Sequence, residues 1–252
     1  MKNLNKVAEI TLYFWIMKIL ATTLGETLGD LISMTLNLGY TISLLITTFF
    51  FLIVLFLQLK ASKYIPVLYW LVIVGTTTVG TEVSDLMDRT LGLGYMLGSA
   101  ILFSALMITL AIWYYQNKKI TVYPIFTRKE EIFYWIAILF SNSLGTAFGD
   151  FLSDNIGLSY LTGAMVTAGI IAVVIILHYL TKLNEVVLFW IAFIFTRPFG
   201  ATFGDLLTKP VSKGGLALGT IPATLVTTFL LGLLIIYATK KHNAQKTVNL
   251  NP

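Results

Sequence analysis

The strongest constraint on the fold is a series of long apolar segments that contain no charged residue. Residues 42–59 and 97–113 are two of them, and each is about as long as the stretch of helix that crosses the hydrocarbon core of a bilayer. A backbone in lipid must satisfy its own hydrogen bonds, which leaves helices or a closed barrel. Barrel strands alternate apolar and polar residues. These segments do not alternate, so they predict transmembrane helices.

Composition extends this prediction to the whole chain. Hydrophobic residues make up 57% of the sequence and charged residues 12%, whereas soluble domains typically carry about 25% charged residues. The net charge of +5 does not indicate nucleic acid binding, because lysine and arginine are concentrated between the apolar segments. The chain contains no cysteine, which excludes disulfides and thiolate metal sites.

An internal repeat divides the chain into four units. Four tryptophans are each followed by an aspartate fifteen positions later, and a glycine lies five positions before each aspartate. The tryptophans are Trp15, Trp70, Trp135 and Trp190, the glycines are Gly25, Gly80, Gly145 and Gly200, and the aspartates are Asp30, Asp85, Asp150 and Asp205. Agreement at three positions in four units indicates tandem repetition. The tryptophan spacings of 55, 65 and 55 residues group the units into two halves.

Each unit is predicted to contain a first helix that carries the tryptophan and the aspartate, a short turn, and a more apolar second helix. We place the units at about 7–59, 64–115, 129–180 and 184–238, within a single membrane domain of residues 1–240 that precedes a cytoplasmic tail at 241–252. Two spans per unit make all four repeats parallel, with a symmetry axis along the membrane normal. The predicted fold is therefore all-α and polytopic, with about eight transmembrane helices.

Positive charges predict the orientation of the chain. Twelve lysines and arginines lie at the ends of the chain and between repeats, against three in the turns within repeats. Such a bias marks the cytoplasmic side, so both termini are expected in the cytoplasm. Eight of the twelve acidic residues lie instead on the outer part of the first helices.

One face of each first helix is polar. At about 100° per residue, the positions three, four, seven and eight before the aspartate, and three and four after it, lie within about 80° of it. Such a stripe must face other helices or water rather than lipid. The candidate ion- or substrate-binding residues are Asp30, Asp85, Asp150, Asp205, Glu26, Glu82, Asn142 and Arg197, and the four aspartates are the candidate metal ligands.

A packing interpretation of the same residues stays open. Small residues let transmembrane helices approach closely, so the glycines are expected to serve packing, and the tryptophans to pack or to anchor the helices. Each aspartate lies about 22 Å along the helix from its tryptophan, which is near the outer interface, where it would cap a helix or hairpin. Arg197 is expected to neutralise one acid. Lys18, about 120° from the stripe, is expected to extend to the cytoplasmic face.

The repeat resembles a bacterial family of uncharacterised membrane proteins built from four tandem two-helix repeats with a characteristic tryptophan. The resemblance rests on the four tryptophans and on the segment Gly25-Glu26-Thr27-Leu28-Gly29-Asp30 with its counterparts, and it extends to about Lys240. It implies a protein of the bacterial inner membrane and brings no activity with it. The fourth repeat departs most, with Arg197-Pro198 and a longer turn.

These features predict a secondary transporter or channel-like permease with a central polar path. The acidic residues would bind a hard metal ion, a proton or a small organic cation. No nucleophile–base pair appears, so we expect no enzyme, although an intramembrane enzyme, a lipid-handling protein and a structural or partner-binding subunit stay as alternatives. The expected partners are the lipid bilayer and a small cation or proton, with a homo-oligomer as a further possibility and no nucleic acid. The sequence does not identify a cofactor.

Overall fold

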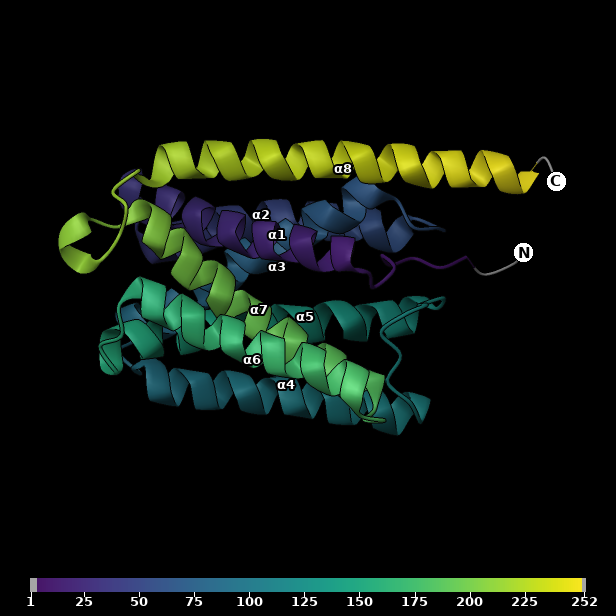
Figure 1. Ribbon diagram of the computed structural model, residues 1–252, viewed down its shortest axis with the longest axis horizontal. Helices are drawn as coiled ribbons and strands as arrows, with labels where there is room; N and C mark the ends of the chain where they lie inside the picture. The colour runs from purple at the N-terminus through teal and green to yellow at the C-terminus, as the bar shows by residue number, and fades with distance from the viewer. Residues whose placement is uncertain (1–3, 251–252) are drawn as a thin grey trace.

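The computed structural model describes residues 4–250 of the chain, except for the side chains of residues 213 and 245–250. Eight long helices, paired within four repeats, account for most of this part of the chain (Figure 1). They are α1 (Leu12–Asp30), α2 (Gly39–Lys60), α3 (Pro66–Asp85), α4 (Tyr95–Asn117), α5 (Arg128–Asp150), α6 (Tyr160–Leu180), α7 (Glu185–Thr208) and α8 (Thr220–Leu250). The predicted all-α fold is confirmed.

Seven of these helices are long and apolar enough to cross a membrane. The remaining one, α1, is less apolar because it carries Lys18, Glu26 and Asp30. It nevertheless lies side by side with α3 and α7 inside the bundle. The molecule is therefore built as a polytopic helical membrane protein.

The first helices of the four repeats form a closed inner ring. Helix α1 packs on α3, α3 on α5, α5 on α7, and α7 on α1 again. Each second helix packs outside the ring against the first helix of the next repeat, so that α2 covers α3, α4 covers α5, α6 covers α7, and α8 returns to cover α1. Buried residues make up 61–67% of the spans of α3, α5 and α7 and only 22–28% of those of α2, α4, α6 and α8. The first helices, whose polar stripe was predicted to face other helices or water, therefore lie inside, and the more apolar second helices lie outside.

Equivalent residues of the four repeats lie at the same level, as expected for parallel units. The repeated glycine of each inner helix packs against the residue eight positions before the aspartate of the next repeat. A Cβ added at Gly25 would lie 2.5 Å from the Cβ of Thr77, and one added at Gly200 would lie 2.6 Å from the Cβ of Thr22. The same contact joins Gly80 to Asn142 and Gly145 to Arg197. Only glycine permits this approach, so the packing interpretation of the glycines is confirmed.

One end of the bundle holds the two ends of the described chain and is called the terminal end below (Figure 1). An aromatic layer lies in the ring there. It pairs each repeated tryptophan with the aromatic residue just before it. Rings also touch across repeats, with Phe14 5.6 Å from Trp70 and Tyr69 5.3 Å from Trp135. The aromatic residues sixteen positions before the aspartates are Phe14, Tyr69, Tyr134 and Phe189, which makes this a further recurring position of the repeat.

The opposite end, called the Asp end, begins where the inner helices reach their aspartates. In three repeats the helix continues for one wider π-helical turn, at Leu31–Thr35 (η1), Leu86–Thr90 (η2) and Phe151–Asn155 (η3). In the fourth repeat α7 is followed by a longer connection with a 3-10 turn, Val211–Lys213 (η4). The last helix, α8, continues to Leu250 and so includes most of the segment predicted as a cytoplasmic tail.

Candidate functional site

The four repeated aspartates gather at the Asp end of the inner ring. They occupy the same position in α1, α3, α5 and α7, and only 3–6% of each residue's surface is exposed. Burial of a carboxylate is costly unless it is paired, and two basic residues from the turns provide the pairing. The carboxylates are therefore held in two groups, each made by two neighbouring repeats.

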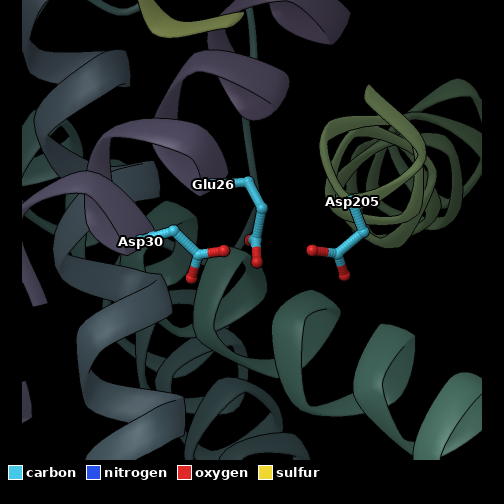
Figure 2. Close-up of side chains that lie close together, drawn as sticks. All are labelled: Glu26, Asp30 and Asp205. Atoms are coloured by element: carbon cyan, nitrogen blue, oxygen red, sulfur yellow. The ribbon is translucent and has the colours of Figure 1, made fainter. Parts of the chain in front are cut away.

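Lys209 joins the fourth repeat to the first. Its Nζ lies 2.6 Å from Oδ2 of Asp30 and 3.2 Å from Oδ1 of Asp205. The lysine side chain is 24% exposed, so the ion pairs are only partly shielded from solvent. Glu26 completes this group, because carboxylate oxygens of Glu26, Asp30 and Asp205 all lie within 4.8 Å of one another. Figure 2 shows the three side chains converging from α1 and α7.

Arg89 joins the second repeat to the third in the same manner. Its Nε lies 2.9 Å from Oδ1 of Asp85, and its Nη2 lies 3.1 Å from Oδ2 of Asp150. A third carboxylate, that of Asp154, lies 3.8 Å from the same Nη2. Both bridging cations occupy the position four residues after the aspartate, in the second and fourth repeats only. The site therefore has approximate twofold rather than fourfold symmetry.

The sequence contained a signal for these two bridges. Residues four apart on a helix face the same side and readily form ion pairs, and both cations stand four positions after an aspartate. Arg89 and Lys209 entered the prediction as basic residues of the turns and as stripe positions four residues after an aspartate, but not as candidate site residues. Their contact with the aspartate of the next repeat depends on which inner helices become neighbours in the ring. The spacing of residues within one helix does not predict that.

Arg197 forms a buried ion pair in the ring. Its Nη2 lies 2.8 Å from Oε2 of Glu26 and also donates to the hydroxyl of Thr81. The whole arginine residue is 0% exposed. Its Nε and Nη1 donate to no group in the described part of the chain. The prediction that Arg197 neutralises one acid is confirmed, and the arginine keeps spare donors.

Lys18 corrects one prediction from the sequence. It does not extend to a membrane face, because the residue is 0% exposed and its Nζ donates to Oδ1 of Asn142 at 2.7 Å. The same Nζ lies 3.9 Å from the centre of the Phe193 ring. Asn142 in turn donates to the Thr76 hydroxyl at 3.0 Å. The position of Lys18 is explained by ring packing, which places it toward the neighbouring inner helices.

Glu82 lies apart from the other candidate residues. One carboxylate oxygen, Oε1, accepts a hydrogen bond from Ser43 of α2 at 2.8 Å. The other, Oε2, is buried and has no hydrogen-bond partner among the described residues. A Cβ added at Gly29 would lie 3.6 Å from Oε1, which places the carboxylate beside α1. Glu82 is therefore a buried acid at the junction of α1, α2 and α3.

The predicted metal ligands do not form one group of four. Among the described residues, the set of three or more acidic or histidine side chains close enough to share an ion is Glu26, Asp30 and Asp205. The contacts of Asp85 and Asp150 with Arg89 separate them from this set. Oxygen ligands of this kind suit hard cations. A metal ion at this place would have to displace Lys209 from Asp30.

The fold and the buried charges define a four-repeat helical membrane protein with a polar inner ring. A family model described as Repeat of Unknown Function (DUF347) matches residues 13–64, 68–119, 133–184 and 188–242. The chain belongs to this family, and the four matches coincide with the four helix pairs of the structure. No curated protein and no solved structure matches this chain at a significant level.

Proposed function

We propose that this protein is a secondary transporter or channel-like permease that moves a cation along the inner ring. The observation that carries the proposal is the group of Glu26, Asp30 and Asp205, whose carboxylate oxygens lie within 4.8 Å of one another in a buried position. Acidic residues within membrane spans tend to mark ion pathways and proton relays. This group belongs to two different repeats, so relative movement of the repeats would change it.

The charge balance supports cation or proton binding. Eight acidic residues lie on the outer parts of the inner helices and the turns that follow. Three described basic side chains, Arg89, Arg197 and Lys209, form ion pairs with them. Carboxylates crowded in a poorly solvated region cannot all stay ionised, because desolvation and like charges both disfavour the charged form. A bound cation or a proton relieves this repulsion, so the two should compete and cation flux should fall as the pH is lowered.

The proposed setting is the bacterial cytoplasmic membrane, with both termini in the cytoplasm. The support is the excess of lysine and arginine at the terminal end and between repeats. The aspartates would then face the outer side. Oxygen ligands favour hard cations, and the substrates to test are therefore Na⁺, K⁺, Mg²⁺, Mn²⁺ and choline.

Proteoliposomes test the proposal. Purified protein is reconstituted with an internal pH dye, and each cation is added outside while the membrane potential is clamped. We expect one cation to produce a protein-dependent proton or cation flux that Asp30→Asn and Asp205→Asn reduce at least about tenfold, because asparagine keeps the size of the side chain and removes its charge. Glu185→Gln, at an exposed residue near the terminal end, is the matched control and should keep wild-type flux.

The competing function is structural, and the ion pairs between repeats favour it. In that case, one of two results is expected. Either the wild type transports none of the five cations, or the Asp30→Asn and Asp205→Asn proteins insert, fold and keep the wild-type rate for the cation that the wild type transports. Either result would contradict the transport proposal. A lipid-handling protein or an intramembrane enzyme has no comparable support in the described contacts.

A further inference from the structure

A second polar group lies deeper in the inner ring, between the aromatic layer and the aspartates. Its central members are Lys18 of α1 and Arg197 of α7. Both residues are 0% exposed. Lys18 contacts the ring of Phe193, which lies one helical turn before Arg197. Both cations also approach α5 within one helical turn, because Lys18 donates to Asn142 and the stem of Arg197 packs on Gly145. Two buried basic side chains therefore lie in the middle of the inner ring.

The described side chains balance only part of this charge. Glu26 forms an ion pair with Arg197. Lys18 has no carboxylate within 4.0 Å among the described residues, and its partner is the neutral amide of Asn142. An isolated buried ammonium group is strongly disfavoured unless a counter-charge or hydrogen-bond acceptors compensate it.

Arg197 supplies an independent indication of a ligand. A guanidinium group has five N–H donors in a fixed planar arrangement. Nη2 of Arg197 serves Glu26 and Thr81, while Nε and Nη1 are buried and donate to no described group. Buried donors are normally satisfied by protein or by a bound molecule. Arg197 therefore has unused buried donors, and it meets α5 within one helical turn of the residue that Lys18 contacts.

We propose that Lys18 and Arg197 bind a small monovalent anion, such as a halide or a small carboxylate, in the middle of the inner ring. The anion would accept hydrogen bonds from the Lys18 ammonium and from the free N–H groups of Arg197, and it would neutralise the excess positive charge. This site differs in place and in sign from the acidic group at Glu26, Asp30 and Asp205. The proposal does not depend on transport.

Thermal unfolding of the purified protein tests anion binding directly. The protein is prepared in sodium gluconate, a large anion, and chloride, bromide or formate replaces gluconate at constant ionic strength. We expect a saturable rise in Tm of about 4 °C with a small anion, because a ligand that binds only the folded state stabilises it. Equal Tm values in chloride, bromide, formate and gluconate would overturn the proposal. They would indicate that Lys18 is neutral or hydrated instead of paired with an anion.

Variants locate the site. In Lys18→Met the apolar stem is kept and the charge removed, so the anion-dependent rise in Tm should disappear. Lys119→Met, at an exposed lysine, is the matched control and should keep it. Asn142→Asp is a second variant in case Lys18→Met does not fold. It keeps Lys18 and places a carboxylate beside the ammonium group, where it would replace the anion. This variant should be as stable in gluconate as the wild type is in chloride, with no further rise; a wild-type anion response in Asn142→Asp would overturn the assignment.

A bromide-soaked crystal of the wild type gives the position without any variant. An anomalous bromide peak between Lys18 and Arg197 is expected, and a peak elsewhere with none beside these residues would contradict the site. Asp30→Asn distinguishes the acidic group from the anion site. This variant should keep the anion-dependent rise in Tm and lose cation flux. A protein that binds anions but transports no cation would support this inference and refute only the transport proposal.

Discussion

Lys209 and Asp30 stand 179 positions apart in the sequence, and their side chains form an ion pair of 2.6 Å between Nζ and Oδ2. This contact bridges the seam where α7 packs on α1, and it joins the last repeat to the first. Lys209 also holds Asp205 of its own repeat at 3.2 Å. One lysine therefore compensates two buried carboxylates at the seam between the ends of the repeat array.

Lys209→Met should destabilise the protein by about 2 kcal/mol, because it leaves Asp30 and Asp205 without their cation. The expected loss is smaller than for a fully buried pair, since Lys209 is 24% exposed. Thermal or denaturant unfolding in detergent measures it. Lys182→Met, at an exposed lysine, is the control. The double variant Lys209→Met/Asp30→Asn should lose less than the sum of the two single variants, and additive losses would show that the pair is not coupled.

The glycines of the ring should differ sharply from glycines on the outer helices. Gly200→Ala would place its Cβ 2.6 Å from the Cβ of Thr22, so α1 and α7 must separate. Overpacking of this kind costs about 1–3 kcal/mol. Gly169→Ala is the matched control, because nothing lies within 4 Å of a Cβ added there.

Gly169→Ala should be neutral or more stable by up to about 1 kcal/mol, since alanine favours helix. Both substitutions are compared by Tm and by the yield of monodisperse protein. Equal effects at the two positions would contradict the close contact at Gly200.

Glu131 should hold the N-terminal segment against the bundle. Its carboxylate is buried and accepts from Lys6 and, at 2.9 Å, from Nε2 of Gln58. Glu131→Gln removes the charge that balances Lys6 and should cost about 3 kcal/mol. Hydrogen exchange of residues 4–11 should then become faster. Glu9→Gln, at an exposed acid of the same segment, should leave that exchange unchanged, and protection retained in Glu131→Gln would exclude this role.

Topology mapping should place both termini and the connection near Lys118 in the cytoplasm. The turns near Asn37 and Lys213 should lie outside, because the connections between repeats carry most of the lysine and arginine. Accessibility of single introduced cysteines to an impermeant thiol reagent measures this in cells, and the natural chain has no cysteine to interfere. Labelling of the C-terminal region from outside would reverse the proposed orientation.

Local features of the sequence were sufficient for the fold class and for much of its symmetry. The uncharged apolar segments predicted membrane helices, since lipid offers the backbone no hydrogen bonds. The recurrence of tryptophan, glycine and aspartate predicted four parallel units, and the polar stripe predicted which helix of each unit lies inside. Each inference depends on residues within one or two helical turns, or on simple repetition, and periodicity reports such features directly.

Only the tertiary structure decided how the charges combine. Closure of the ring brings Lys209 to Asp30, and it turns Lys18 toward Asn142 rather than toward a membrane face. It also divides the four aspartates into two pairs, each bridged by one cation, although the repeat alone predicted four equivalent aspartates. The physical reason is that the sequence places a cation after the aspartate in alternate repeats only, and the geometry of the neighbouring helix then determines which second carboxylate it reaches.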